Sequence, residues 1–342
     1  MKVLVLGSGE VSSLLSLQEC MNVMEETFRA MARGEATFPP RQAVPIPEGK
    51  GALGLMPGLL SYKGVAGLKA TTVFPGNVNT AYESHQGAVL IFETDHGRPL
   101  AIVDAGSITR IRTAAVSAVA TNALARKDID ELAILGSGTQ AASHLEAMLT
   151  ARPDIGRVRV YSRTRSKTEA FAKKASSAHG VSVRAAESAR DAVKGAGLIC
   201  TTTASTSPIL LGAWLEPGMH INAIGASRPP ARELDSEAVS KGLLFVDSRQ
   251  SAMAESDDFR VPRSEGLIDD SHIRGELGEV LEGKVSGRSG PDDITIFKSL
   301  GLAIEDLAAA HHVYVKARSE GRGEFLEFGA ERSASPSKSR LG

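Results

Sequence analysis

The fold is decided by the stretch Leu132-Ala133-Ile134-Leu135-Gly136-Ser137-Gly138-Thr139-Gln140-Ala141. Its first four residues are apolar and predict a buried strand, and residues 140–149 have the pattern of a helix. Between them, Gly136 permits a sharp turn, Gly138 lets the backbone approach a pyrophosphate, and Ala141 allows close contact between helix and strand. Free N–H groups and the positive end of the helix dipole would meet the phosphates there. In this strand–turn–helix context the pattern predicts a dinucleotide-binding site that contains Gly136, Ser137, Gly138, Thr139 and Gln140.

The segments that follow alternate between strand and helix. Apolar runs at 158–161, 181–183, 198–201, 220–224 and 243–246 predict strands, with helices at 168–178 and 188–194 between some of them. Regular alternation is typical of parallel βαβ units, and we therefore expect an α/β fold with a doubly wound Rossmann sheet. Thr202, Ile224 and Ser227 follow strands at their carboxyl ends, where the nicotinamide half of a cofactor would lie.

The end of the strand at 158–161, the next strand after the motif, indicates which dinucleotide binds. An NAD enzyme usually has an acidic residue there, which holds the ribose 2′-hydroxyl. This chain has Ser162-Arg163-Thr164-Arg165-Ser166-Lys167 instead. Because hydroxyls and guanidinium groups suit a 2′-phosphate, we expect Ser162, Arg163 and Thr164 to favour NADP(H), with NAD(H) still open as a cofactor. The alternative is that these cations are simply solvated.

A second Gly-Ser-Gly sequence, Gly7-Ser8-Gly9, lacks that context. We interpret it as a tight turn, with the next helix beginning only at a capping box formed by Ser16 and Glu19. The Asp95-His96-Gly97 turn between two apolar runs predicts a hairpin. Residues 1–120 are thus predicted to contain strands mixed with helices, and an Ala-rich helix is predicted at 108–125.

Composition limits the function classes. The chain has 342 residues, enough for two domains, and a net charge of −1, which favours neither a nucleic-acid nor a membrane partner. No apolar run is long enough to span a bilayer, and the start reads as a strand rather than a signal peptide, so we expect a cytoplasmic protein. Cys20 and Cys200 are expected to be buried, reduced thiols. The histidines have no metal-ligand spacing, because the side chains of His311 and His312 diverge on a helix.

Three cations in the first part of the chain stand out as candidates for anion binding. Arg41 follows a pair of prolines, Lys69 lies within an apolar strand, and Arg112 begins the Ala-rich helix. Burying a cation is costly unless it meets an anion. An internal salt bridge or a snorkelling side chain explains Lys69 as well as a bound ligand does, and its spacing alone does not decide between them.

Residues 35–315 resemble the ornithine cyclodeaminase/mu-crystallin family, and its mu-crystallin branch in particular. The matching stretches occur in the family's order. They are Leu53-Gly54-Leu55-Met56-Pro57, Ser84-His85-Gln86, Ile108-Thr109-Arg110-Ile111-Arg112-Thr113-Ala114-Ala115, the nucleotide motif, Ile221-Asn222-Ala223-Ile224-Gly225-Ala226-Ser227-Arg228-Pro229, Val246-Asp247-Ser248, Glu276-Leu277-Gly278-Glu279-Val280 and Phe297-Lys298-Ser299-Leu300-Gly301 before Glu305-Asp306.

The resemblance implies a domain layout and a homodimer. Residues 1–125 with 294–320 would form a smaller α+β domain for substrate binding and dimerisation, and 126–293 the NADP(H)-binding domain. From 321 to 342 the chain is rich in Ser, Gly and charge, and its composition predicts disorder.

The resemblance also implies residue roles. Arg41, Lys69 and Arg112 match the family's ligands for the substrate carboxylate, with Lys69 the candidate catalytic proton donor and Arg112 also near the nicotinamide. His85 matches a ligand-contacting position, although a hydrogen-bonded histidine at a strand end is an equal alternative. Ser227 would contact both substrate and cofactor, and Lys298 and Ser299 would reach the cofactor.

The residue at position 227 separates the activities of the family. Members that cyclise ornithine or lysine have an Asp there, whereas this chain has Ser227. Without that carboxylate, reduction of a preformed cyclic imine, such as Δ1-pyrroline-2-carboxylate or Δ1-piperideine-2-carboxylate, is the favoured reaction. The alternatives are an ornithine cyclodeaminase, an alanine-type amino acid dehydrogenase, and, in another class, an NADP(H)-dependent protein that only binds a small ligand.

Overall fold

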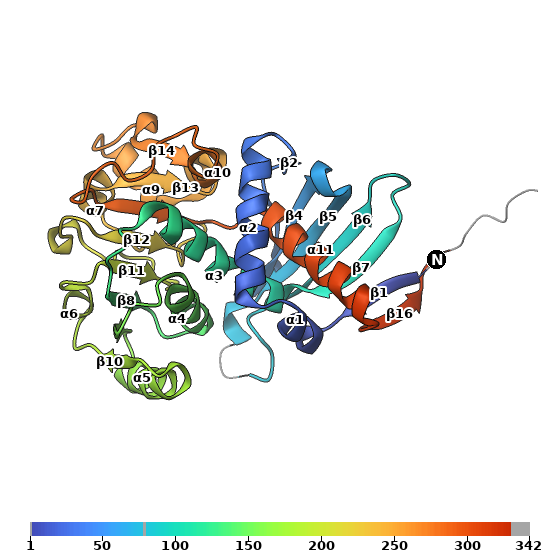
Figure 1. The fold of residues 1–342 in the computed structure, drawn as a ribbon, viewed down its shortest axis with the longest axis horizontal. Coiled ribbons are helices and arrows are strands. Elements are labelled where there is room, and N and C mark those ends of the chain that lie inside the picture. Colours follow the sequence, from blue (N-terminus) through green and yellow to red (C-terminus); the bar gives the residue numbers. More distant parts are fainter. Residues whose placement is uncertain (1, 78–79, 330–342) are drawn as a thin grey trace, which may run out of the picture.

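The chain forms two separate eight-stranded sheets in the computed structural model, which describes residues 2–77 and 80–329. The first sheet has the order β16-β1-β7-β6-β5-β4-β2, with β3 paired to β4. The second has the order β10-β9-β8-β11-β12-β15-β13-β14. Figure 1 shows the two sheets as two bodies side by side, with helices between them and around the second sheet. The predicted α/β fold is confirmed.

The first sheet combines a long antiparallel meander with the first strand of the chain. The hairpin predicted at Asp95-His96-Gly97 joins β6 to β7, and the Glu93 carboxylate accepts hydrogen bonds from the backbone N–H groups of Asp95 (2.7 Å) and Arg98 (2.9 Å) at this turn. The strands of this sheet are β1 (Lys2–Leu6), β2 (Ala36–Thr37), β3 (Gln42–Ile46), β4 (Gly51–Leu60), β5 (Val65–Val73), β6 (His85–Glu93), β7 (Pro99–Asp104) and β16 (Glu324–Glu327).

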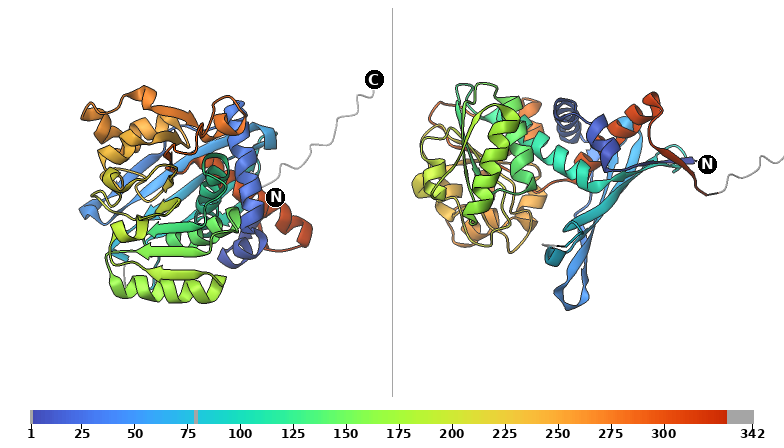
Figure 2. Two further views of the ribbon diagram at one scale, coloured as in Figure 1. Left: turned by 60° about the vertical axis from the view of Figure 1, so that its left-hand side comes forward. Right: turned by 90° about the horizontal axis from the view of Figure 1, so that it is seen from below.

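Helices cover one face of the first sheet. They are α1 (Ser8–Leu14), α2 (Leu17–Ala32), the first part of α3 (Ala105–Leu124) and α11 (Ala303–Glu320), and Figure 2 shows the meander reaching beyond them. The capping box at the start of α2 is confirmed, since Ser16 N–H donates to Glu19 (3.0 Å) and Glu19 N–H to the Ser16 hydroxyl (3.3 Å). The turn predicted at Gly7-Ser8-Gly9 is wrong in one respect. Helix α1 begins directly at Ser8, because Gly7 serves as its N-cap without needing a side chain.

The second sheet is parallel throughout. From β8 the chain goes outward through β9 and β10 on one side and through β11 and β12 on the other, so the strand order reverses between β8 and β11. A ligand crevice is expected at the carboxyl ends of the strands at such a point. The strands are β8 (Glu131–Leu135), β9 (Arg157–Tyr161), β10 (Ser182–Ala185), β11 (Leu198–Thr201), β12 (His220–Ala223), β13 (Leu243–Val246), β14 (Ile273–Glu276) and β15 (Thr295–Lys298). The helices are α4 (Thr139–Ala151), α5 (Arg165–His179), α6 (Ala189–Val193), α7 (Ser236–Lys241), α8 (Arg249–Glu255), α9 (Asp257–Ser264) and α10 (Leu277–Leu281).

Two boundaries differ from those expected from the sequence. Strand β15 belongs to the second sheet, between β12 and β13, although 294–320 was assigned to the first domain. Strand β16 lies within the segment predicted to be disordered, where it pairs antiparallel with β1 and satisfies the backbone groups of that edge. The rest of that prediction, from residue 330 on, lies outside the described residues.

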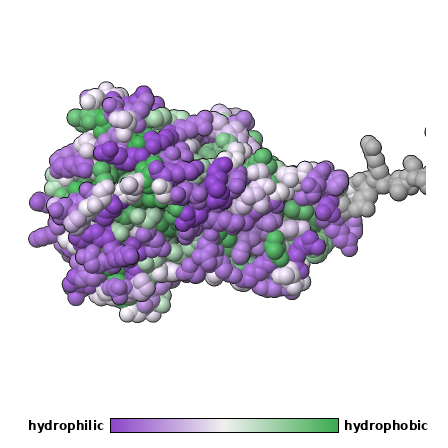
Figure 3. Space-filling model, turned by 45° about the horizontal axis from the view of Figure 1, so that its top comes forward, coloured by the Kyte–Doolittle hydropathy of each residue, from purple (hydrophilic) through white to green (hydrophobic). Residues whose placement is uncertain are grey.

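Helix α3 links the two bodies. Its Thr121 hydroxyl accepts a hydrogen bond from Asn222 of β12 (2.8 Å), and Ser117 meets His144 of α4 at 3.0 Å. Cys20 and Cys200 are buried and unpaired, as predicted. On the face shown in Figure 3, hydrophobic residues form small scattered groups in a mostly hydrophilic surface. Within residues 2–77 and 80–329, no helix has both the length and the apolarity needed to cross a membrane.

Candidate active site

A hollow lies at the point where the strand order of the second sheet reverses. Seven of the residues predicted to bind the cofactor are found in its wall, namely Gly136, Ser137, Gly138, Ser162, Arg163, Thr164 and Thr202. Leu135, Tyr161, Lys167, Thr203 and Ile209 complete it. None of these five was predicted from the sequence as a site residue, although Lys167 belongs to the cationic run after β9.

The glycines of the motif fit a bound pyrophosphate. Gly136 has a φ of 131°, and a Cβ there would lie 2.3 Å from the Thr202 hydroxyl, so only glycine is accommodated. Gly138 is the N-cap of α4, and a Cβ on it would meet no atom within 4 Å, which leaves space directly in front of the helix N-terminus. The first turn of α4 has no acidic residue to repel an anion.

The ribose end of the hollow has hydroxyls and cations. Ser137 donates to the Ser162 hydroxyl (2.9 Å), which in turn lies 2.6 Å from that of Thr168. Arg163 and Lys167 line the hollow, and none of its lining residues is acidic. Arg165 has other partners, since it forms ion pairs with Glu169 (2.7 Å) and Glu187. The residues present thus fit a dinucleotide, including one with a 2′-phosphate.

Other residues predicted to bind the cofactor lie outside this wall. Thr139 and Gln140 belong to the first turn of α4, Ile224 is 6% exposed, and Ser227 is half-buried in the loop after β12. Lys298 is 2% exposed, and its Nζ lies 2.9 Å from Asp258, so the structure gives it an ion pair beneath the site and not a contact within it. Ser299 is equally buried, with its hydroxyl directed at Asp247 (3.5 Å).

Lys69 and Arg112 form a buried cluster with two acidic residues of α11. Lys69, in the middle of β5 opposite Val89, places Nζ 2.6 Å from Asp306 and donates to the Thr109 hydroxyl (3.4 Å). Arg112 donates from Nε to the other oxygen of Asp306 (2.9 Å) and pairs through Nη1 with Glu305. Lys69 is 5% and Arg112 4% exposed, and both acids are fully buried. The internal salt bridge considered for Lys69 is therefore present.

Burial and charge act against each other in this cluster. Burial lowers the pKa of Lys69, which Asp306 only partly offsets. Burial also opposes ionisation of Asp306, but Arg112 and Lys69 overcome it and hold the pKa of Asp306 below its usual range. Glu305 has Arg112 as its cation, and burial raises its pKa to about 7. Asp306 is thus the ionised partner that both cations share.

Arg41 contacts the turn at Leu300 and Gly301, beside Arg112. Its Nη2 donates to the backbone carbonyls of Leu300 (3.0 Å) and Gly301 (3.2 Å), and its Nε pairs with Glu255 (2.7 Å). The N–H groups of the same turn donate to the buried carboxylate of Asp247. Arg41 and Asp247 therefore fix the turn that precedes α11.

His85 and Arg228 connect this cluster with the second sheet. Partial desolvation lowers the pKa of His85, and the charges of Arg228 and Lys69 lower it further. His85 begins β6 of the first sheet, and Arg228 follows β12 of the second. A residue that follows the second sheet thus lies close enough to the first sheet for its charge to influence His85. The sequence alone did not indicate Arg228 as a site residue.

Glu233 holds two loops of the site together and was missed from the sequence. Its carboxylate accepts five hydrogen bonds, from the hydroxyls of Thr201 (2.7 Å) and Thr203 (2.7 Å) and the backbone N–H groups of Thr203 (2.6 Å), Gly225 (2.7 Å) and Ala226 (3.2 Å). A Cβ on Gly225 would lie 2.0 Å from the carbonyl oxygen of Thr203, so the loops are in backbone contact. In the sequence, Glu233 is simply an acidic residue followed by the apolar Leu234, and this pattern does not predict a buried carboxylate.

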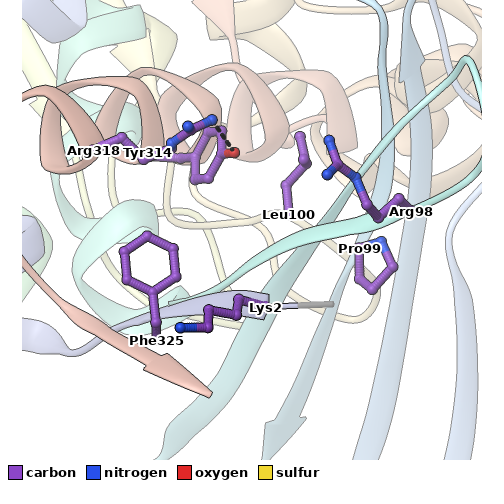
Figure 4. A pocket seen from close by; sticks show the side chains of 7 residues that line it. All are labelled: Lys2, Arg98, Pro99, Leu100, Tyr314, Arg318 and Phe325. Atoms are coloured by element: carbon purple, nitrogen blue, oxygen red, sulfur yellow. Dashed lines mark hydrogen bonds between the residues drawn. The ribbon is translucent and has the colours of Figure 1, made fainter. Parts of the chain in front are cut away.

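A second hollow lies far from these residues, between β1, the start of β7 and the end of α11. Figure 4 shows Lys2, Arg98 and Arg318 around it, with Arg318 donating to the Tyr314 hydroxyl (3.1 Å). It contains none of the predicted site residues.

The fold and site define a dinucleotide-binding α/β protein, with the nucleotide hollow in its second sheet and a buried charged cluster between β5 of its first sheet, α3 and α11. A profile of the ornithine cyclodeaminase/mu-crystallin family matches residues 1–321, and the chain belongs to this family.

Known proteins resemble this one over nearly its whole length. Ketimine reductase mu-crystallin of Mus musculus is 44% identical over 281 residues, 82% of this chain and 85% of that protein. The solved structure of Thermococcus litoralis Delta(1)-pyrroline-2-carboxylate reductase in complex with NADH and L-proline superposes with a TM-score of 0.91 at 35% identity, covering 94% of this chain and 99% of that chain. An archaeal alanine dehydrogenase dimer with bound NAD has a TM-score of 0.91 at 36% identity, covering 96% and 100%.

Proposed function

We propose that this chain, an NAD(P)H-dependent oxidoreductase acting on C=N bonds, reduces cyclic α-imino acids such as Δ1-pyrroline-2-carboxylate and Δ1-piperideine-2-carboxylate to L-proline and L-pipecolate. The mu-crystallin ketimine reductase and the pyrroline-2-carboxylate reductase among its relatives support this substrate class. The observation that carries the proposal is the loop after β12. It presents Ser227 where cyclising members of the family carry an Asp, and Glu233, which holds this loop, is occupied by five donors. No base for ammonia loss is provided by these two residues.

The residues of the chain have distinct roles in this proposal. The bound nicotinamide supplies a hydride when reduced. Gly136, Gly138 and the start of α4, with Thr139 and Gln140, hold its pyrophosphate. Thr202, Ile224 and Ser227 shape the nicotinamide end. Lys69 supplies the proton from Nζ, and Arg41, Arg112 and His85 attract the substrate carboxylate.

We further propose NADP(H) as the preferred cofactor. Ser162, Arg163 and Thr164 form the ribose end of the hollow, and its wall has no carboxylate to bind a 2′-hydroxyl. The relatives solved with NADH or NAD keep NAD(H) as the alternative.

A second candidate function, alanine-type amino acid dehydrogenation, is favoured by the likeness to the archaeal alanine dehydrogenase. The two functions differ in whether the imine is a preformed ring or is made from a keto acid and ammonia. A cyclodeaminase and a protein that only binds its ligand are the remaining alternatives.

The test measures the oxidation of NADPH, as a loss of its absorbance, in the presence of each of the two cyclic imines. We expect turnover with at least one ring size, and slow or no turnover with pyruvate and ammonia. L-ornithine with NAD should release no ammonia above background. Turnover only with pyruvate and ammonia would establish the second candidate, and sustained ammonia release would contradict the argument from Ser227.

A further inference from the structure

Asp306 is the one carboxylate in the charged cluster that contacts both predicted substrate cations. Its Oδ2 lies 2.6 Å from Lys69 Nζ, and its Oδ1 accepts from Arg112 Nε at 2.9 Å. Because each oxygen serves a different cation, the carboxylate fixes the direction of the Lys69 side chain relative to the Arg112 guanidinium. The side chain of Asp306 is fully buried, so water does not compete for either contact.

The surroundings of Lys69 contain charges from three further elements. Asp306 and Glu305 approach from α11, Arg112 from α3, and His85 from the start of β6 is close enough for Lys69 to influence its pKa. Cys20 of α2 lies near Arg112, and burial raises the pKa of its thiol, so it stays neutral. Two cations thus face two acids. Of these acids, only Asp306 contacts Lys69 directly.

An ammonium in such a place depends on its counter-ion. Burial penalises the charged form of Lys69, and the charge of Asp306, whose Oδ2 lies 2.6 Å from Nζ, opposes that penalty. Removing the negative charge alone would leave Lys69 beside Arg112 with no contacting anion. A neutral amine at Nζ cannot protonate an imine, so the charge state of Lys69 decides whether the reaction proceeds.

We propose that Asp306 is a positioning residue for imine reduction, which holds Lys69 protonated and aimed at the substrate. The inference rests on the proposed function. The proton leaves Nζ for the imine nitrogen and forms the N–H bond, while the imine carbon accepts the hydride that reduced nicotinamide supplies and the C=N π bond breaks. The product is the cyclic amino acid with oxidised nicotinamide, and the neutral Lys69 amine regains its proton from water.

Glu305 provides a matched control on the same turn of α11. Its carboxylate pairs with Arg112 and accepts from the N–H of Leu302 (3.0 Å), but it does not contact Lys69. Asp306→Asn and Glu305→Gln each replace a fully buried carboxylate with an amide of similar size. Asp306→Asn removes the charge that contacts Lys69, whereas Glu305→Gln removes a charge that contacts Arg112 but not Lys69.

The experiment measures kcat/KM for the cyclic imine against pH. In the wild type it should fall on the alkaline side, where Lys69 loses its proton. In Asp306→Asn this fall should move at least about one pH unit lower, a tenfold loss of proton affinity. In Glu305→Gln it should move clearly less, and Asp306→Glu should restore part of the wild-type profile. Equal shifts in both amide variants, or an equal loss of rate at every pH, would overturn the proposal.

Thermal unfolding against pH provides a readout that does not need turnover. In Asp306→Asn the folded-state pKa of Lys69 would lie further below the unfolded value of about 10.4, so the folded state binds fewer protons than the unfolded state over that window. Stability relative to the wild type should therefore recover as pH rises from neutral toward about 10. Glu305→Gln should show no recovery above about pH 8, since Glu305, whose pKa burial raises to about 7, is ionised in both states there. If the wild type reduces no cyclic imine while this recovery is seen, the proposed function fails and the pairing of Asp306 with Lys69 stands; a flat difference contradicts the pairing itself.

Discussion

At the scale of single residues, two neighbouring arginines after β9 have different surroundings. Arg163 lines the nucleotide hollow, whereas Arg165 is held by Glu169 and Glu187. A charge-assisted hydrogen bond contributes about 1.5–3 kcal/mol, which is roughly a 10- to 100-fold change in affinity. We expect Arg163→Ala to weaken NADPH binding by about this factor and NADH binding very little. Fluorescence titration of the variant and the wild type with NADPH and with NADH measures these affinities.

The control for this prediction is Arg165→Ala, which should change neither affinity, since that guanidinium already has two carboxylate partners. If Arg163→Ala weakened NADPH and NADH equally, Arg163 would act on a part that the two cofactors share, and the preference for NADP(H) would lose its physical basis.

The sequence drew attention to the buried cations of the cluster but not to their partners. Lys69 and Arg112 stood out because a cation in an apolar segment needs an anion. Their partner Asp306 is distant in the chain, and no local pattern joins a strand residue to a helix that begins after another domain. Lys298 was assigned to the cofactor for the same reason, because its partner Asp258 could not be foreseen.

At the scale of elements, the loops after β11 and β12 depend on one carboxylate. Glu233→Gln replaces an oxygen acceptor with an N–H group that faces donors, and a mispaired buried donor costs about 1–3 kcal/mol. We expect the loops at 202–205 and 224–228 to exchange their amide hydrogens faster, and kcat to fall more than the affinity for cofactor. Hydrogen exchange and steady-state kinetics measure the two effects.

Asp235→Asn is the matched control, an acid-to-amide change two residues away. Asp235 caps α7 by accepting from the N–H of Ala238 (2.8 Å), a role that Asn also performs. Asp235→Asn should therefore leave the rates of amide hydrogen exchange in both loops as they are in the wild type. Faster exchange throughout the second sheet in Glu233→Gln would instead indicate general destabilisation.

The elements themselves were foreseen where their patterns are local. The nucleotide motif, the hairpin at β6 and β7 and the capping box of α2 each depend on a few adjacent residues, and each is found as predicted. Strand β16 was not foreseen, because Glu324–Glu327 gains its partner only from β1 at the other end of the chain. Pairing with a distant edge overrides a composition that predicts disorder.

At the scale of the whole molecule, the meander of the first sheet extends beyond its covering helices (Figure 2). Among the described residues, strand β3 pairs with β4 alone, and its Val44 is 52% exposed. An exposed strand of this kind needs a cover to avoid unspecific pairing. We expect a second copy of the chain to cover this part of the sheet.

The matched substitutions Val44→Asp and Val315→Asp test where the two copies meet. Val315, on α11, is 51% exposed, nearly the same as Val44, but it lies on the helical side of the sheet. A charge in a buried interface is strongly unfavourable, whereas the same charge on a solvated face costs little. Light scattering should therefore give twice the mass of one chain for the wild type and Val315→Asp, and a lower mass for Val44→Asp at the same concentration. A monomeric wild type would contradict the dimer, and dissociation by Val315→Asp alone would place the interface on the helices.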